Sequence, residues 1–161
     1  MSLRTRMLLA SAAVVLVIVP GTIAVAGAGT GGTTDDEAQL IAAARRTEAA
    51  IVAAVNDKQW DKLRALYAHD AVLLPPNHEP VLGPDAIVDY IRSIRDAVGK
   101  LDLEEEYLRV KASGNMASLA VTFSANSGHL RMTDAELYER QPDGSVVMTV
   151  EQVGFRERPA G

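Results

Sequence analysis

Residues 113–156 read SGNMASLAVTFSANSGHLRMTDAELYERQPDGSVVMTVEQVGFR. Apolar and polar side chains alternate along this stretch, and short turn sequences interrupt it at 113–115, 126–128 and 142–144. Alternation with a period of two is typical of strands, and connections this short join antiparallel neighbours. The sequence therefore predicts a meander of four strands, over residues 101–112, 117–124, 130–140 and 146–156.

Helical periodicity precedes this meander. The segment TDDE at 34–37 forms a capping box, and apolar residues then recur at spacings of three and four as far as Asn56. Asp57 can cap a second helix that carries Trp60, Leu63, Leu66 and Tyr67 on one face.

A third helix follows a short strand and a loop. Residues 71–74 form a brief apolar run that ends at two prolines, and residues 75–83 are expected to be a loop. Pro84 suits the first position of the third helix. Three helices followed by an antiparallel meander predict an α+β fold, with the helices packed on one face of a curved antiparallel sheet.

The first 28 residues look like a targeting segment. Arg4 and Arg6 precede an apolar stretch at 7–19, and small residues follow at 24–28. We expect a cleaved signal peptide; the alternative is an uncleaved membrane anchor over residues 7–28, which is long enough to span a bilayer. Both predict that the rest of the chain is exported, to the cell envelope or outside the cell, with a flexible tether at 29–34 and one domain at 35–158.

A glycine pattern at 27–32 matches the dinucleotide-binding motif G-x-G-x-x-G. The helix after it opens with Asp35, Asp36 and Glu37, which repel a pyrophosphate at the end where it would bind. We therefore expect no cofactor, and interpret these glycines as part of the tether.

Composition excludes several other classes of protein. The 161 residues contain 16 basic and 21 acidic side chains, for a net charge of -5, which does not suit a nucleic-acid partner. The absence of cysteine rules out disulfides, thiolate metal sites and cysteine nucleophiles. The only histidines, at 69, 78 and 129, lack the spacing of metal ligands, so we expect no metal site. The acidic run at 104–106 reads as a solvated strand edge.

The order of predicted elements resembles that of the ketosteroid-isomerase-like, or nuclear transport factor 2-like, superfamily. Within it, LYAHDAV at 66–72, the proline pair at 75–76 and GPDAI at 83–87 resemble the SnoaL-like branch. The resemblance covers about residues 36–157. It implies a cone in which the sheet curls around a pocket that the helices close, and a homodimer formed through the open face of the sheet. It does not define a function, because the superfamily includes enzymes, transport factors and domains without known activity.

The steroid isomerases of this superfamily use a carboxylate base, with an oxyanion hole made by a tyrosine and a protonated carboxylic acid. Aligning the LYA segment places the base at Pro75 and the oxyanion tyrosine at Ile51, and neither residue can do that chemistry. The acid falls at Glu136 and a supporting tyrosine at Tyr67. The resemblance therefore implies that steroid isomerase chemistry is lost.

Glu136 and His78 are the candidate catalytic residues. Glu136 shares one face of its predicted strand with Met132, Asp134 and Tyr138. If that face lines the cone, Glu136 is a buried carboxyl able to donate or accept a proton; if it faces solvent, Glu136 is an ordinary surface charge. His78 stands beside Glu79 in the proline-rich loop and is either a proton shuttle at the pocket rim or an exposed loop histidine.

Four aromatic residues are candidates for the pocket wall: Tyr67, Trp60, Tyr90 and Tyr138. Core packing is the commoner role for Tyr67 and Trp60. We expect the domain to bind a small apolar molecule or a partner chain. The alternatives are a cyclase, dehydratase or isomerase that uses Glu136 with His78, and a structural envelope module held by residues 7–28.

Overall fold

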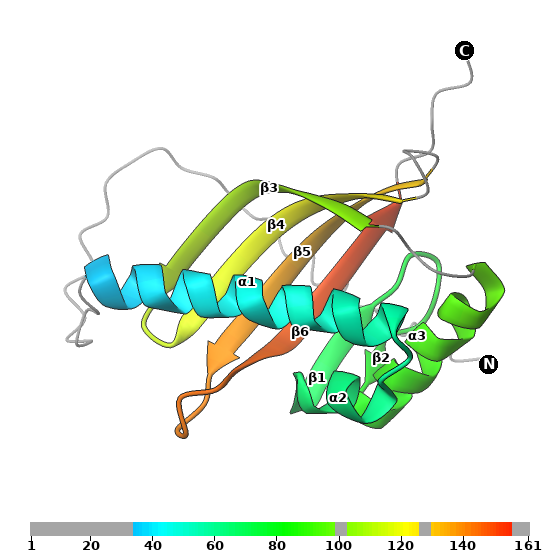
Figure 1. Cartoon of the computed structure of the whole chain (residues 1–161), viewed down its shortest axis with the longest axis horizontal. Helices are drawn as coiled ribbons and strands as arrows, with labels where there is room; N and C mark the ends of the chain where they lie inside the picture. Colours follow the sequence, from blue (N-terminus) through cyan, green and yellow to red (C-terminus); the bar gives the residue numbers. More distant parts are fainter. Residues whose placement is uncertain (1–33, 99–102, 126–129, 156–161) are drawn as a thin grey trace, which may run out of the picture.

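The computed structural model describes residues 34–98, 103–125 and 130–155 (Figure 1). The predicted signal peptide or anchor, nearly all of the tether and the predicted turn at 126–128 lie outside the described residues. The described part is an α+β fold in which helices cover one face of a curved six-stranded sheet, as the sequence predicted.

The longest helix, α1 (Thr34–Asn56), lies across the inner face of the sheet (Figure 1). Its bounds agree with the prediction. Leu40, Ala44, Ile51 and Val55 on its apolar stripe are buried against the sheet. Thr47 fixes this packing, because its hydroxyl donates a buried hydrogen bond of 2.7 Å to the carbonyl oxygen of Val146.

The second helix differs from the prediction in two ways. Helix α2 (Trp60–Ala65) ends before Tyr67, and its N-cap is Gln59 rather than Asp57. The amide of Asp57 still donates to the carbonyl of Ala53, and Lys58 takes a positive φ of 56°, so the chain turns one residue later. Asp57 therefore belongs to the end of α1.

The first strand is longer than predicted because it has a partner that is distant in sequence. Strand β1 (Tyr67–Leu74) begins at Tyr67, which pairs with Met148, and the amide of Met148 donates to the carbonyl of Leu66 at 2.9 Å. Strand β2 (Val81–Leu82) lies within the predicted loop and pairs with β1. Helix α3 (Pro84–Val98) then begins at the predicted proline.

The meander has the predicted order and antiparallel pairing. Its strands are β3 (Leu103–Ser113), β4 (Met116–Ala125), β5 (Leu130–Arg140) and β6 (Val146–Phe155). The sheet order is β2-β1-β6-β5-β4-β3, so β1 joins the meander through a parallel pairing with β6. Register shifts interrupt the pairing of β1 with β6, of β3 with β4 and of β5 with β6, and such bulges bend a sheet.

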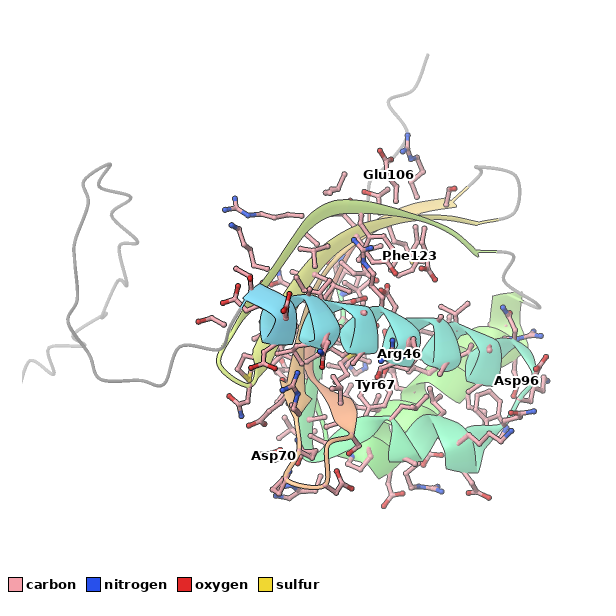
Figure 2. The ribbon with its side chains drawn as sticks, turned by 60° about the vertical axis from the view of Figure 1, so that its left-hand side comes forward. Arg46, Tyr67, Asp70, Asp96, Glu106 and Phe123 are labelled. Atoms are coloured by element: carbon pink, nitrogen blue, oxygen red, sulfur yellow. The ribbon has the colours of Figure 1, made fainter. Side chains whose placement is uncertain are left out.

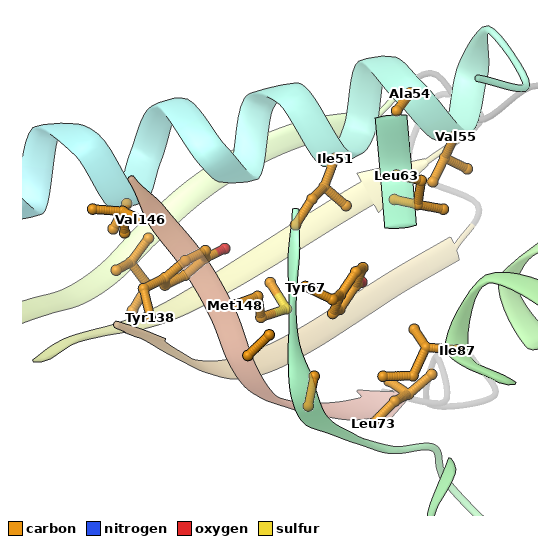
Figure 3. Close-up of a cluster of buried hydrophobic side chains, with 14 of the residues drawn as sticks. Ile51, Ala54, Val55, Leu63, Tyr67, Leu73, Ile87, Tyr138, Val146 and Met148 are labelled. Carbon is orange, nitrogen blue, oxygen red and sulfur yellow. The ribbon is translucent and has the colours of Figure 1, made fainter. Parts of the chain in front are cut away.

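The core fills the space between the helices and the inner face of the sheet. Tyr67 and Met148 project from neighbouring strands toward Ile51 of α1 (Figure 3). Phe123 lies on the same inner side, whereas Glu106 lies on the outer side (Figure 2). Alternation therefore directs every second residue of the meander into the interior.

Candidate functional site

A cavity of about 330 Å³ lies between α1, α3 and the inner face of the sheet. This volume is at the lower end of the range for small-molecule sites. Most of its wall is apolar, with Ile51 and Val55 from α1, Ile91 from α3, and Phe123 and Met148 from the sheet. Pro75 and Ile51, the positions aligned with the isomerase base and oxyanion tyrosine, both line it.

Four carboxyl groups interrupt this apolar wall: Glu48, Asp134, Glu136 and Glu151. In each case the position of the residue on its helix or strand points the side chain toward the cavity. Glu48 occupies the apolar stripe of α1, one turn before Ile51. Asp134 and Glu136 alternate along β5, and Glu151 of β6 pairs directly with Glu136. We refer to these four residues as the acidic cluster.

Three of the four side chains in the acidic cluster are deeply buried, and Glu151 is half-buried. Glu48 is 2%, Glu136 3% and Asp134 5% exposed to solvent. Glu136 therefore faces the interior of the fold and is not a solvent-exposed surface charge. Removing a carboxylate from water is costly unless the group gains a partner or a proton.

Three tyrosines donate hydrogen bonds to the cluster. The hydroxyl of Tyr67 donates to Oε2 of Glu151 at 2.7 Å, and that of Tyr138 donates to Oε2 of Glu136 at 2.9 Å. Tyr107 of β3 donates to Oε2 of Glu48 at 3.0 Å and also approaches Glu105 at 3.0 Å. Burial and the adjacent carboxylates raise the pKa of all three phenols, so these hydroxyls keep their protons.

Proton affinity in the cluster is raised mainly by desolvation and then by mutual repulsion. Burial, followed by the charges of Glu48 and Glu151, raises the pKa of Glu136 to about 10. Burial and the charge of Glu151 raise the pKa of Asp134 to about 8. Burial and the charge of Glu105 raise the pKa of Glu48 to about 7, and the hydrogen bond from Tyr107 opposes this rise. Burial likewise raises the pKa of Glu151, against the hydrogen bond from Tyr67.

Glu48 and Glu136 both line the cavity and influence each other's pKa, and a hydrogen bond between two carboxyl groups needs a proton on one of them, because two carboxylates offer no donor. Glu136 has the higher pKa, so it is the member of the pair that holds the proton and can donate it to Glu48. The pair is thus a shared-proton carboxyl pair facing an apolar cavity. Such a pair can donate to an acceptor, or give up its proton to a base.

The predicted pocket aromatics are divided between the cavity and the core. Tyr67 and Tyr90 line the cavity. Tyr138 is fully buried behind it and holds Glu136, whereas Trp60 is packed against the core with the Arg92 guanidinium 5.2 Å from its ring centre.

His78 does not line the cavity, so the structure does not bring it together with Glu136. It is exposed, with Nδ1 2.8 Å from the carbonyl oxygen of Glu79, and its ring lies 5.2 Å from that of Tyr90 between centroids. His78 thus lies behind the cavity wall at Tyr90 rather than in the cavity. The exposed-histidine reading agrees with this position.

Sequence reasoning missed Glu48, Glu151 and Arg95 as cavity residues. Glu48 carried a detectable signal, because it is a charged residue in the middle of the apolar stripe of α1. Glu151 and Arg95 carried none, since their positions depend on the pairing of β6 and on the packing of α3. Arg95 is 8% exposed and donates one long hydrogen bond, of 3.3 Å, to the carbonyl of Asn56.

Within residues 34–98, 103–125 and 130–155, no group of three or more His, Cys, Asp or Glu side chains has an arrangement that could hold a metal ion. In the same ranges, no helix has the length and apolar character needed to cross a bilayer. The predicted acidic edge at 104–106 falls on β3, the last strand of the sheet, where Glu106 is exposed and Glu105 turns inward toward Tyr107.

Solved structures with the same fold come from several bacteria. A ketosteroid isomerase-like protein from Erwinia carotovora atroseptica is 20% identical, with a TM-score of 0.61 over 73% of this chain and 97% of its own. A proposed dehydratase of the nuclear transport factor 2-like family from Streptomyces avermitilis is 12% identical, with a TM-score of 0.65 over 75% of this chain and 99% of its own. A nuclear transport factor 2-like protein of unknown function from Pseudomonas putida is 19% identical, with a TM-score of 0.65 over 76% and 90%.

At these identities the structures establish the fold and leave the activity open. No curated protein matches the sequence. The family model of the SnoaL-like domain matches residues 49–149, from the middle of α1 to the middle of β6. This segment contains every residue of the cavity wall except Glu48, Glu151 and Val153. The chain therefore belongs to the SnoaL-like family.

Proposed function

We propose that this protein binds a small, largely apolar molecule in its cavity and does not carry out steroid isomerase chemistry. The observation that supports binding is a cavity of about 330 Å³ whose apolar wall surrounds a single group of buried polar side chains. Ligand sites commonly combine an apolar wall with a few convergent polar groups that orient the ligand.

The two isomerase positions support the second half of the proposal. Pro75 has no proton-accepting side chain, and Ile51 has no hydrogen-bond donor, yet both line the cavity. A substrate carbonyl in this cavity would therefore meet Glu136 without the base and the tyrosine that complete the isomerase mechanism.

A second candidate is an enzyme of the cyclase, dehydratase or isomerase type. It is favoured by the raised pKa values of Glu48 and Glu136. The pKa of Glu48, about 7, lies near neutral pH, where a general acid or base transfers protons most efficiently. In this candidate Glu136 is the acid and Glu48 takes the part that the sequence analysis gave to His78, which is exposed.

Native mass spectrometry of the full chain, purified without refolding, tests the binding proposal. Retained mass beyond that of the polypeptide supports it and gives the size of the ligand. Loss of that mass in a variant with a narrowed cavity, Val55→Phe, assigns the ligand to the cavity. A ligand-free protein that also takes up no apolar probe contradicts it.

Turnover distinguishes the second candidate from the first. Once a ligand is identified, it is incubated with the protein and with Glu136→Gln. A product that forms with the wild type and not with Glu136→Gln favours the enzyme. Unchanged ligand in both incubations favours binding alone.

We also propose that the protein is exported and forms a homodimer through the outer face of its sheet. Exposed Leu108 and Leu137 on the meander support the dimer. Sedimentation of the wild type and of Leu137→Lys tests it, since a dimer that becomes a monomer is expected. The mass of the mature chain in cell fractions tests export and distinguishes cleavage from an anchor at residues 7–28.

A further inference from the structure

The acidic cluster offers more hydrogen-bond acceptors than the protein supplies donors. Oδ1 of Asp134 and Oε1 of Glu48 are buried and receive no hydrogen bond from a permanent donor. The Glu48 carboxyl accepts from Tyr107 on its other oxygen, and the Asp134 carboxyl has a hydrogen bond from the backbone amide of Gly154. Both residues line the cavity, and a rotation of the carboxyl group would turn its unpartnered oxygen, which is closed off in this structure, toward a ligand there.

Charge in the cluster is also unbalanced. Among the residues that the structure describes, no ion pair joins any of the four carboxyls to a cation. Arg95 lines the same cavity but donates to the carbonyl of Asn56. Buried carboxylates are normally paired with a cation or neutralised by a proton. The three tyrosine donors favour the ionised forms, because each offers a hydroxyl hydrogen to a carboxyl oxygen.

We propose that the molecule bound in the cavity is an apolar amine, whose ammonium group lies among Glu48, Asp134, Glu136 and Glu151. This inference rests on the proposed binding function and names its ligand class. An ammonium carries a positive charge and up to three N–H donors, which meet both the missing charge and the free acceptor oxygens. The apolar remainder of the ligand is expected to contact Ile51, Phe123 and Met148.

Other ligand classes fit less well. A carboxylate or phosphate could accept from the buried, unpartnered Nε of Arg95, but it would add negative charge to a cavity that four carboxyls already line. A metal ion requires several ligands with fixed geometry, and no such group exists among residues 34–98, 103–125 and 130–155. A neutral carbonyl could accept the Glu136 proton, but it would leave Oδ1 of Asp134 without a donor.

Binding of an amine is linked to protons, because the empty cluster holds protons that the ammonium replaces. Each carboxyl that ionises on binding releases one proton to the buffer. The affinity for a permanently protonated amine therefore rises as the pH rises through about 7 and about 8, where Glu48 and Asp134 release their protons. The other titratable or charged groups that face the cluster are Tyr67 of β1, Tyr90 and Arg95 of α3, Glu105 and Tyr107 of β3, Glu136 and Tyr138 of β5, and Glu151 of β6.

Hexylamine and hexanol form a matched pair of probes for this proposal. They have the same apolar chain. The amine stays protonated between pH 6 and pH 8, because an alkylamine, like the lysine side chain, has a pKa of about 10. Calorimetry on the full chain is expected to give an affinity for hexylamine at least about tenfold higher than for hexanol at pH 8. Hexylamine affinity is expected to rise about tenfold per pH unit for each proton released, while hexanol affinity changes little.

Variants locate the ammonium. Asp134→Asn and Glu48→Gln keep the size of the side chain and remove the charge, and each is expected to weaken hexylamine about tenfold or more while hexanol binding is kept. Glu106→Gln removes an exposed charge on the outer side of the sheet and is the control that should leave both affinities unchanged. If one of the two cluster variants fails to fold, the other still tests the proposal.

The outcomes separate this inference from the proposed function. Hexanol that binds as tightly as hexylamine, or hexylamine whose affinity does not rise with pH, overturns the amine while leaving an apolar pocket. Failure of both probes to bind overturns the proposed function as well. Preference for hexylamine that survives in both cluster variants also overturns the inference, because the amine then binds elsewhere.

Discussion

At the scale of single residues, the main feature is a pair of buried carboxyls, Glu136 and Glu48, whose pKa values are raised. Both are almost fully buried, and each accepts a tyrosine hydroxyl on one of its oxygens. The folded chain therefore binds protons that the unfolded chain releases near the ordinary carboxyl pKa of 4.5. This difference connects stability to pH.

The free energy of unfolding is expected to fall as the pH rises above about 5. The pKa values of Glu48, Asp134 and Glu136 are raised in the folded state, so the folded state binds more protons than the unfolded state across this range. Stability then decreases with pH until about 10, where the folded Glu136 also ionises. Thermal unfolding between pH 5 and pH 9 measures this trend. A melting temperature that rises across the range contradicts a protonated cluster.

Glu136→Gln is expected to stabilise the protein at pH 8 by about 1–3 kcal/mol and to flatten its pH dependence. A glutamine amide replaces the donor that protonated Glu136 offers to Glu48 and still accepts the hydroxyl of Tyr138. The cost of holding a proton at alkaline pH then disappears. Urea unfolding at pH 6 and pH 8 measures the effect, and Glu106→Gln is the matched control on the outer side. Destabilisation at pH 8 by Glu136→Gln would show that Glu136 is ionised in the folded protein.

At the scale of elements, one buried side-chain bond joins the first helix to the last strand. Thr47 of α1 donates to the carbonyl of Val146, 99 positions later in the sequence. This bond sets the position of Glu48, the next residue along the helix, opposite Glu136. It also explains why a polar residue occupies the buried face of α1.

Thr47→Val is expected to lower the free energy of unfolding by about 1–2 kcal/mol, because it keeps the shape of the side chain and leaves the Val146 carbonyl without its donor. The matched control is Thr149→Val on β6. Thr149 makes a longer, exposed bond of 3.2 Å to the carbonyl of Leu137, and water can replace it. Chemical denaturation of both variants gives the comparison. Equal losses from the two would mean that the Thr47 bond does not hold α1 on the sheet.

At the scale of the whole molecule, the curved sheet and the helices leave a space that side chains do not fill. Val55 of α1 borders this space, whereas Val88 of α3 is fully buried in the core and is not part of the cavity wall. The same enlargement of the side chain therefore has different consequences at the two positions.

Val55→Phe is expected to change stability by less than about 1 kcal/mol, because the ring can occupy the cavity, and to weaken binding of apolar probes about tenfold or more. Val88→Phe is expected to cost about 1–3 kcal/mol, because no space receives the ring. Denaturation and probe titration measure the two effects. Comparable destabilisation at both positions would mean that the cavity collapses around Val55 and is not available to a ligand.

Local patterns were sufficient to predict most of the fold. The prediction of α1 at 34–56 and of a strand at 130–140 was confirmed to the residue, because each pattern expresses one periodicity over many residues. The start of β1 was wrong, since Tyr67 fits an apolar helical stripe and only its pairing with Met148 makes it a strand residue. The catalytic roles suggested for Glu136 and His78 stay predictions.

The sequence by itself determined the order of elements, the meander and the family, because these depend on spacing between near neighbours and on the short LYAHDAV and GPDAI segments. Only the tertiary structure decided that Glu136 faces inward, that Glu48 and Glu151 join it, and that His78 does not. Glu48, Glu136 and Glu151 come from three different elements, and their meeting depends on the pairing of β5 with β6 and on the seating of α1 across the curved sheet. Contacts between residues so far apart in the chain leave no periodic trace in the sequence, which is why the acidic cluster appeared only in the folded molecule.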